Sequence, residues 1–64
     1  MIRVNGVEHA EVFDSVTAMM NEMAIEPKGV AVAINGEVIR RGEWVSTSIH
    51  DGDVVEIVNA VAGG

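Results

Sequence analysis

The residues whose type and position most clearly allow a reaction are the last two of the sequence, Gly63 and Gly64. Glycine has no Cβ, so a glycine backbone fits a channel too narrow for other residues and adopts φ and ψ values that they avoid. The α-carboxylate of Gly64 is then a reactive group that the chain can present deep inside another protein. Gly64 is therefore the candidate modified residue. Val61, Ala62 and Gly63 are expected to form a flexible tail that threads into partner active sites.

Other residue types that support catalysis or metal binding are few or poorly spaced. Cysteine is absent, which excludes disulfides, thiolate metal ligands and cysteine nucleophiles. His9 and His50 lack a companion ligand at helical or hairpin spacing, so both are expected at the surface. Asp51-Gly52-Asp53 lacks the bidentate acid of a calcium loop and predicts a plain turn. The sequence also has no glycine-rich phosphate loop. It predicts no catalytic residue in the enzymatic sense, no metal site and no bound cofactor.

Length and charge narrow the function further. The chain has 64 residues, enough for one domain, and 48% of them are apolar, which suits a regular core without disulfides. Ten acidic and four basic residues give a formal charge of -6. This balance argues against nucleic-acid binding and favours a partner with a basic groove, although it also serves solubility alone. No membrane segment or signal peptide is visible, so a soluble cytoplasmic protein is expected. The chain alone is expected to be a monomer.

The N-terminal residues predict a β-hairpin. Apolar and polar residues alternate over residues 1–5, which predicts a strand with Ile2 and Val4 facing the core. Asn5-Gly6 predicts a tight turn, because both residues tolerate positive φ. The returning strand is expected at residues 7–12, on a charged edge of the sheet.

A change of period after this hairpin predicts a single helix of about ten residues. Four apolar residues with spacing i, i+3, i+4 and i+7 define its buried face. These residues are Val16, Met19, Met20 and Met23. Asp14 or Ser15 is expected to cap the helix start. Pro27 is expected to end the helix, because proline disfavours the helical conformation in the preceding residue.

The second half of the chain predicts another hairpin. Large residues alternate with alanines over residues 30–34, and Asn35-Gly36 predicts a turn into a strand at residues 37–40. Residues 41–44 show no clean period and predict a loop or a short helical turn, with Trp44 covering the core.

Two further strands are expected before the tail. Residues 45–49 are compatible with a short edge strand. Residues 54–58 form the most hydrophobic strand, which predicts a central position in the sheet.

These elements predict one helix on one face of a mixed sheet of four to five strands, which is an α+β fold of the β-grasp, or ubiquitin-like, type. We expect the domain to span residues 1–60 and the tail to span residues 61–64. A ferredoxin-like fold would need a second helix. An all-β barrel has no place for a helix whose apolar face must pack against a sheet.

The outward residues of the final strand and its neighbour are expected to form a flat surface next to the tail. Successive side chains of a strand point to opposite faces of the sheet, and we predict that Val55 and Ile57 are the ones that face the helix. The candidate partner-docking face therefore comprises Val54, Glu56, Val58, Ala31 and Ala33. The alternative is that the outward valines simply favour strand formation on a partly exposed sheet.

Taken together, these features resemble the ThiS family of small sulfur carriers in thiamin thiazole biosynthesis, over the whole chain. The matching residues are Ile2 and Val4, Val32-Ala33-Ile34-Asn35-Gly36, Arg41 with Trp44, Asp51-Gly52-Asp53, and Gly63-Gly64. Two departures are Arg40, where proline is expected, and Met19-Met20, where paired leucines are usual.

The resemblance implies a carrier protein and not an enzyme. A ThiF-type adenylyltransferase, related to ubiquitin-activating enzymes, would use ATP and Mg²⁺ to join AMP to the carboxylate of Gly64. Sulfur from a persulfide, supplied through a cysteine desulfurase, would displace AMP and leave a thiocarboxylate. A ThiG-type thiazole synthase would then receive that sulfur.

Three alternatives stay open from the residues alone. The first is a sulfur carrier of another pathway, similar to the small subunit of molybdopterin synthase. The second is a ubiquitin-like protein modifier joined through Gly64 to lysines. The third is a β-grasp interaction domain with an idle tail.

Overall fold

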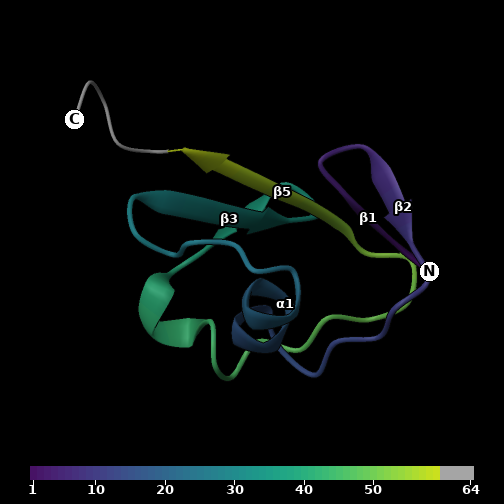
Figure 1. Cartoon of the computed structure of the whole chain (residues 1–64), viewed down its shortest axis with the longest axis horizontal. Coiled ribbons are helices and arrows are strands. Elements are labelled where there is room, and N and C mark those ends of the chain that lie inside the picture. Colours follow the sequence, from purple (N-terminus) through teal and green to yellow (C-terminus); the bar gives the residue numbers. More distant parts are fainter. Residues whose placement is uncertain (60–64) are drawn as a thin grey trace.

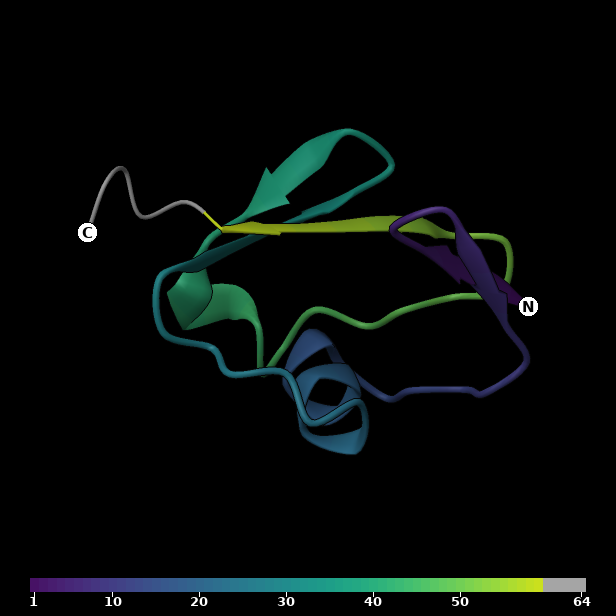
Figure 2. The same ribbon diagram turned by 45° about the horizontal axis from the view of Figure 1, so that its top comes forward.

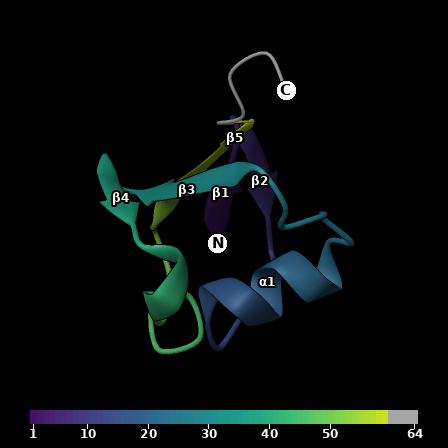
Figure 3. The same ribbon diagram turned by 90° about the vertical axis from the view of Figure 1, so that its left-hand side faces the viewer.

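The computed structural model describes residues 1–59, in which five strands form one sheet that is covered by a helix on one face (Figures 1 and 3). The elements are β1 (Ile2–Val4), β2 (Val7–His9), α1 (Val16–Glu22), β3 (Val30–Ile34), β4 (Glu37–Ile39), a 3₁₀ turn (Arg41–Glu43) and β5 (Val54–Asn59). This is the predicted α+β β-grasp architecture. The predictions made for residues 60–64, including the tail, lie outside the described residues.

The sheet is mixed and has the order β2-β1-β5-β3-β4. β1 and β5 run parallel, whereas the β1–β2, β3–β4 and β3–β5 pairs are antiparallel. β5 therefore lies at the centre, as its hydrophobicity predicted. In Figure 2, the helix lies below the sheet, and the N-terminal hairpin and the end of β5 lie toward opposite sides of the molecule.

Both asparagine-glycine pairs form the predicted hairpin turns. Asn5 and Gly6 have φ values of 51° and 83°, and Asn35 and Gly36 have φ values of 52° and 86°. Positive φ at both central residues is the geometry whose twist matches that of the flanking strands. Each turn therefore fixes the register of its hairpin.

The core lies between the sheet and the helix. Its fully buried side chains belong to Val16, Met19, Val32 and Val55. Met20 is also buried, and Met23 packs against this cluster, so the predicted helix face is confirmed. Trp44 is buried as well, and its indole N–H donates a hydrogen bond to the carbonyl of Ile39 at 3.1 Å. Trp44 thus covers the core with its polar atom satisfied.

The helix is shorter than predicted, and Pro27 does not end it. Ala24 adopts a φ of 55° just after the helix. Its N–H donates to the carbonyl of Asn21 at 3.2 Å, and the N–H of Ile25 donates to the carbonyl of Met20 at 2.9 Å. This pair of bonds is the Schellman motif, which ends a helix through one left-handed residue.

The helix start is capped by Ser15, one of the two predicted candidates. Its Oγ accepts a hydrogen bond from the N–H of Ala18 at 3.1 Å. Ser15 is extended, with φ -156° and ψ 170°, as a residue just outside the helix should be.

The strand predicted over residues 7–12 is also too long. β2 ends at His9, which pairs with Ile2 near the start of the chain, so β1 offers no partner for the residues that follow. Val12 is 88% exposed outside the sheet.

Residues 45–49 do not form the expected edge strand. The carbonyl of Glu43 accepts hydrogen bonds from the N–H of Ser46 at 3.1 Å and from Oγ1 of Thr47 at 2.6 Å. The carbonyl of Thr47 in turn accepts from the N–H of Val16 at 3.1 Å. This segment therefore bonds locally and to the helix start, which leaves Ile49 to enter the core.

Candidate functional site

The side chains of β5 alternate between the core and the outer face of the sheet, as predicted. Val55 is fully buried and Ile57 is half-buried against the core. Val54 and Val58 are 42% and 56% exposed, and Glu56 between them is exposed too. The outward residues of the central strand are thus available to a partner.

The two predicted alanines lie directly beside these residues on β3. Ala33 is opposite Glu56, and Ala31 is opposite Val58, in the antiparallel register of β3 and β5. Directly opposed residues of neighbouring strands point to the same face. The structure therefore brings Ala31, Ala33, Glu56 and Val58 together in one surface, which we call the outer face.

Val38 on β4 belongs to the same surface, although it was not among the predicted residues. It lies opposite Ala33 and is 69% exposed. The signal for it was present in the sequence. A two-residue turn at Asn35-Gly36 pairs Ile34 with Glu37, and the next pair outward is Ala33 with Val38. The outer face therefore presents an apolar valine on each side of the alanines.

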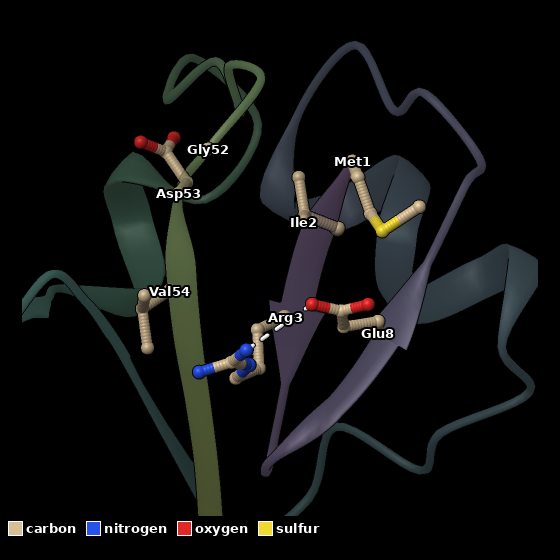
Figure 4. Close-up of a pocket in the computed structure, with 7 residues that line it drawn as sticks. All are labelled: Met1, Ile2, Arg3, Glu8, Gly52, Asp53 and Val54. Carbon is tan, nitrogen blue, oxygen red and sulfur yellow. Dashed lines mark hydrogen bonds and ion pairs between the residues drawn. The ribbon is translucent and has the colours of Figure 1, made fainter.

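A charged pair borders the outer face at the beginning of β5. Arg3 lies opposite Val54 in the parallel register, and its guanidinium contacts the carboxylate of Glu8 on β2 at 3.1 Å. Figure 4 shows these side chains beside a pocket of about 240 Å³ that extends to Asp53 at the start of the strand. Both charges are more than half exposed, so the pair adds little stability. Its effect is to make this border polar.

The end of β5 is contacted by β3, and β3 in turn by the 3₁₀ turn. Asn59, the final residue of β5, is opposite Val30. The carbonyl of Val30 accepts a hydrogen bond from the Arg41 side chain at 3.2 Å. That guanidinium also lies 4.7 Å from the centre of the Trp44 ring, a cation–π contact. The Arg41 side chain therefore connects the 3₁₀ turn to this end of the sheet.

The predicted tail residues Val61, Ala62, Gly63 and Gly64 lie outside the described residues, so their positions add nothing to the site's geometry. The described residues place β5, which contributes Glu56 and Val58 to the outer face, at the centre of the sheet (Figure 1).

Within residues 1–59, no group of three or more acidic or histidine side chains is arranged to hold a metal ion. The imidazole of His50 is 78% exposed and lies 3.9 Å from the Asp53 carboxylate, as expected for a surface residue. His9 is partly buried, with a 25% exposed side chain 3.5 Å from Glu11. In the same part of the chain, no helix has the length and apolarity needed to cross a membrane.

Comparison with known proteins gives the same result by sequence and by structure. The model of the ThiS family matches residues 2–64. The sulfur carrier protein ThiS of Thermus thermophilus is 36% identical over 64 residues, which cover 100% of both chains. A thiazole synthase of Paramagnetospirillum magneticum is 32% identical over 50 residues, which are 78% of this chain and 15% of that protein. The crystal structure of the thiamine biosynthesis protein ThiS from Geobacter metallireducens superposes with a TM-score of 0.84, at 30% identity, covering 98% of this chain and 97% of that one. The chain belongs to the ThiS family.

Proposed function

We propose that this chain is a sulfur carrier protein of thiamin biosynthesis, whose C-terminal Gly64 is adenylated and then converted to a thiocarboxylate. The observation that carries the proposal is the family match, which extends to Gly64 itself. The match to the carrier of Thermus thermophilus likewise spans that whole protein. The fold supports the same role, because a solved structure of a ThiS protein shares it.

The proposed chemistry begins with activation of the Gly64 carboxylate. A carboxylate is a poor electrophile, so one of its oxygens first attacks the α-phosphorus of ATP and pyrophosphate leaves. ATP and Mg²⁺ are bound by the partner, a ThiF-type adenylyltransferase. The resulting acyl-adenylate has AMP as a good leaving group.

Sulfur then enters at the same carbonyl carbon. A persulfide, supplied through a cysteine desulfurase, attacks this carbon and AMP leaves, which gives an acyl disulfide. A partner thiol attacks the outer sulfur and breaks the S–S bond, so that the inner sulfur stays on Gly64 as a thiocarboxylate. The thiocarboxylate delivers its sulfur to a thiazole synthase.

The sulfur content of the chain fits this role. With no cysteine and four methionines, the chain has no thiol that could capture the persulfide sulfur by exchange. Transferable sulfur is therefore held at one position, the carboxyl end of Gly64.

The outer face is proposed as the surface that docks onto these partners. Its alanines allow a partner surface to approach the backbone closely, and Val38 and Val58 supply apolar anchors on either side. The formal charge of -6 favours encounter with a basic groove. For thiazole synthase there is further support, because a protein of that name contains a segment similar to this chain.

The proposal is tested by removing Gly64. The full chain is expected to form an acyl-adenylate with a ThiF-type enzyme and to restore growth of a thiazole-requiring strain that lacks its own carrier. The shortened chain is expected to do neither, while its thermal unfolding is unchanged, because Gly64 has no side chain that could pack in a core. Restored growth with the shortened chain would contradict the proposal. Amide-linked conjugates on target lysines would indicate a modifier instead.

A further inference from the structure

The two edges of β5 are not equally paired. β3 runs along nearly its whole length, from Val30 opposite Asn59 to Ile34 opposite Val55. On the other edge, β1 pairs with Val54 and Val55, and the chain then turns away at Asn5-Gly6. Figure 1 shows this arrangement, with the N-terminal hairpin beside the first part of β5 only.

The side chain of Asn5 continues the hydrogen bonding where β1 stops. Its backbone N–H donates to the carbonyl of Val55 at 2.9 Å, as the last bond of the parallel ladder. Its Oδ1 then accepts from the N–H of Ile57 at 2.7 Å, and its Nδ2 donates to the carbonyl of Ile57 at 3.1 Å. A side-chain amide has the same donor and acceptor as a peptide group. Asn5 therefore acts as one more residue of strand beside β5.

We propose that Asn5 is a positioning residue for the transfer reactions at Gly64. Its side-chain amide holds the backbone of Ile57 on the edge of β5 that β3 does not cover, so that this part of β5 is bonded on both edges. This inference rests on the proposed carrier function. Binding of a flexible segment loses affinity through the ordering of its residues. When residues 57–59 stay on the sheet, fewer residues remain to be ordered as a partner's channel captures Gly64.

The expected consequence is confined to capture of the tail. The free energy needed to order the tail is spent on binding, and the tail is equally ordered in the bound ground state and in the transition state. Removing the Asn5 contact increases this cost, which raises KM and leaves kcat unchanged. A general loss of stability would not follow this pattern, since the folded fraction stays near one for a modest destabilisation.

Asn35 provides a matched control within the chain. It occupies the same position of the same type of turn, with a φ of 52° against 51° for Asn5. Its Oδ1 also accepts a hydrogen bond from a backbone N–H of β5, that of Val54, at 3.0 Å. Val54 is at the start of β5, the end remote from the tail. Glycine in place of either asparagine keeps the turn and removes the side-chain bonds.

The test compares Asn5→Gly with Asn35→Gly in the full chain. Hydrogen exchange followed by NMR is expected to accelerate about fivefold at the Ile57 amide in Asn5→Gly, and at the Val54 amide in Asn35→Gly. Adenylation by a ThiF-type enzyme, measured as pyrophosphate release against carrier concentration, is expected to show a KM roughly three- to tenfold higher for Asn5→Gly with unchanged kcat. Asn35→Gly is expected to keep the KM of the unaltered chain.

Asn5→Asp is a second variant that keeps the acceptor for the Ile57 N–H and loses the donor, and its KM is expected to fall between those of the unaltered chain and Asn5→Gly. An unchanged KM in Asn5→Gly, or equal increases in both glycine variants, would overturn the positioning role while leaving the carrier function intact. Failure of the unaltered chain to be adenylated would overturn the carrier function and this proposal with it.

Discussion

The side-chain amide of Asn35 donates a hydrogen bond to Oδ1 of Asp53 at 3.0 Å. The second oxygen of that carboxylate accepts a hydrogen bond from the N–H of His50 at 2.8 Å. Asp53, whose side chain is 15% exposed, therefore connects the β3–β4 turn with the turn that leads into β5. This contact requires the amide donor of asparagine, which aspartate lacks.

Replacement of Asn35 by aspartate tests this contact. Asn35→Asp keeps the turn but places a second carboxylate against Asp53, so it is expected to lower the free energy of unfolding by about 1–3 kcal/mol. The measurement is urea unfolding followed by tryptophan fluorescence. The double change Asn35→Asp with Asp53→Asn restores one amide and one carboxylate and is expected to recover part of the loss. An Asn35→Asp variant as stable as the original chain would contradict the contact.

The left-handed conformation of Ala24 predicts a stabilising substitution. Ala24→Gly removes the steric cost of a Cβ at a φ of 55°, and we expect a gain of about 0.5–1 kcal/mol after the extra freedom of glycine in the unfolded chain is counted. Thermal unfolding should show a higher midpoint. The control is Ala18→Gly inside α1, which is expected to destabilise by about 1 kcal/mol. If both variants were destabilised equally, the Schellman ending would be wrong.

The helix cap gives a prediction that separates its two candidates. Ser15→Ala removes the oxygen that accepts from the Ala18 N–H and is expected to cost about 1 kcal/mol. Ser15→Asp should retain most of the stability, because its carboxylate also accepts this bond and suits the helix N-terminus. Asp14→Ala is expected to change stability by less than about 0.5 kcal/mol. Chemical unfolding of the three variants makes the comparison, and a larger loss for Asp14→Ala than for Ser15→Ala would refute the assignment.

The proposed docking role of the outer face is tested with two valines of similar exposure. Val58 on the outer face and Val7 on the helix side of β2 are 56% and 58% exposed, and both are in strands. Val58→Asp is expected to weaken binding to a ThiF-type enzyme by at least roughly tenfold, because it places an unpaired charge in the interface. Val7→Asp is expected to change the affinity by less than about twofold. Calorimetric titration measures both, and equal effects would argue against this face.

Much of the fold follows from local patterns. The two Asn-Gly turns, the apolar helix face and the alternation along β5 each depend on residues close together in the sequence, and the structure confirms all three. The outer face could also be predicted, because alternation and the register of a two-residue turn determine which side chains share a surface.

The remaining features depend on contacts between distant segments or on weak signals. Ala24 has the left-handed conformation just after the helix, where glycine is the usual residue, so no glycine marks the end of the helix in the sequence. β2 is short because β1 offers no further partner. Residues 45–49 satisfy their polar groups locally and at the helix start. The bond between Asn5 and Ile57 spans a separation of 52 residues, which no local pattern encodes.

The central claim is that Gly64 carries transferable sulfur, and the intact mass of the chain tests it most directly. The chain is incubated with ATP, Mg²⁺, a ThiF-type enzyme and a persulfide source, and the enzyme's competence is established on its own carrier in parallel. We predict a mass gain equal to the exchange of one oxygen for one sulfur, which disappears when Gly64 is removed. An unchanged mass with a competent enzyme, or the same gain in the shortened chain, would contradict the account.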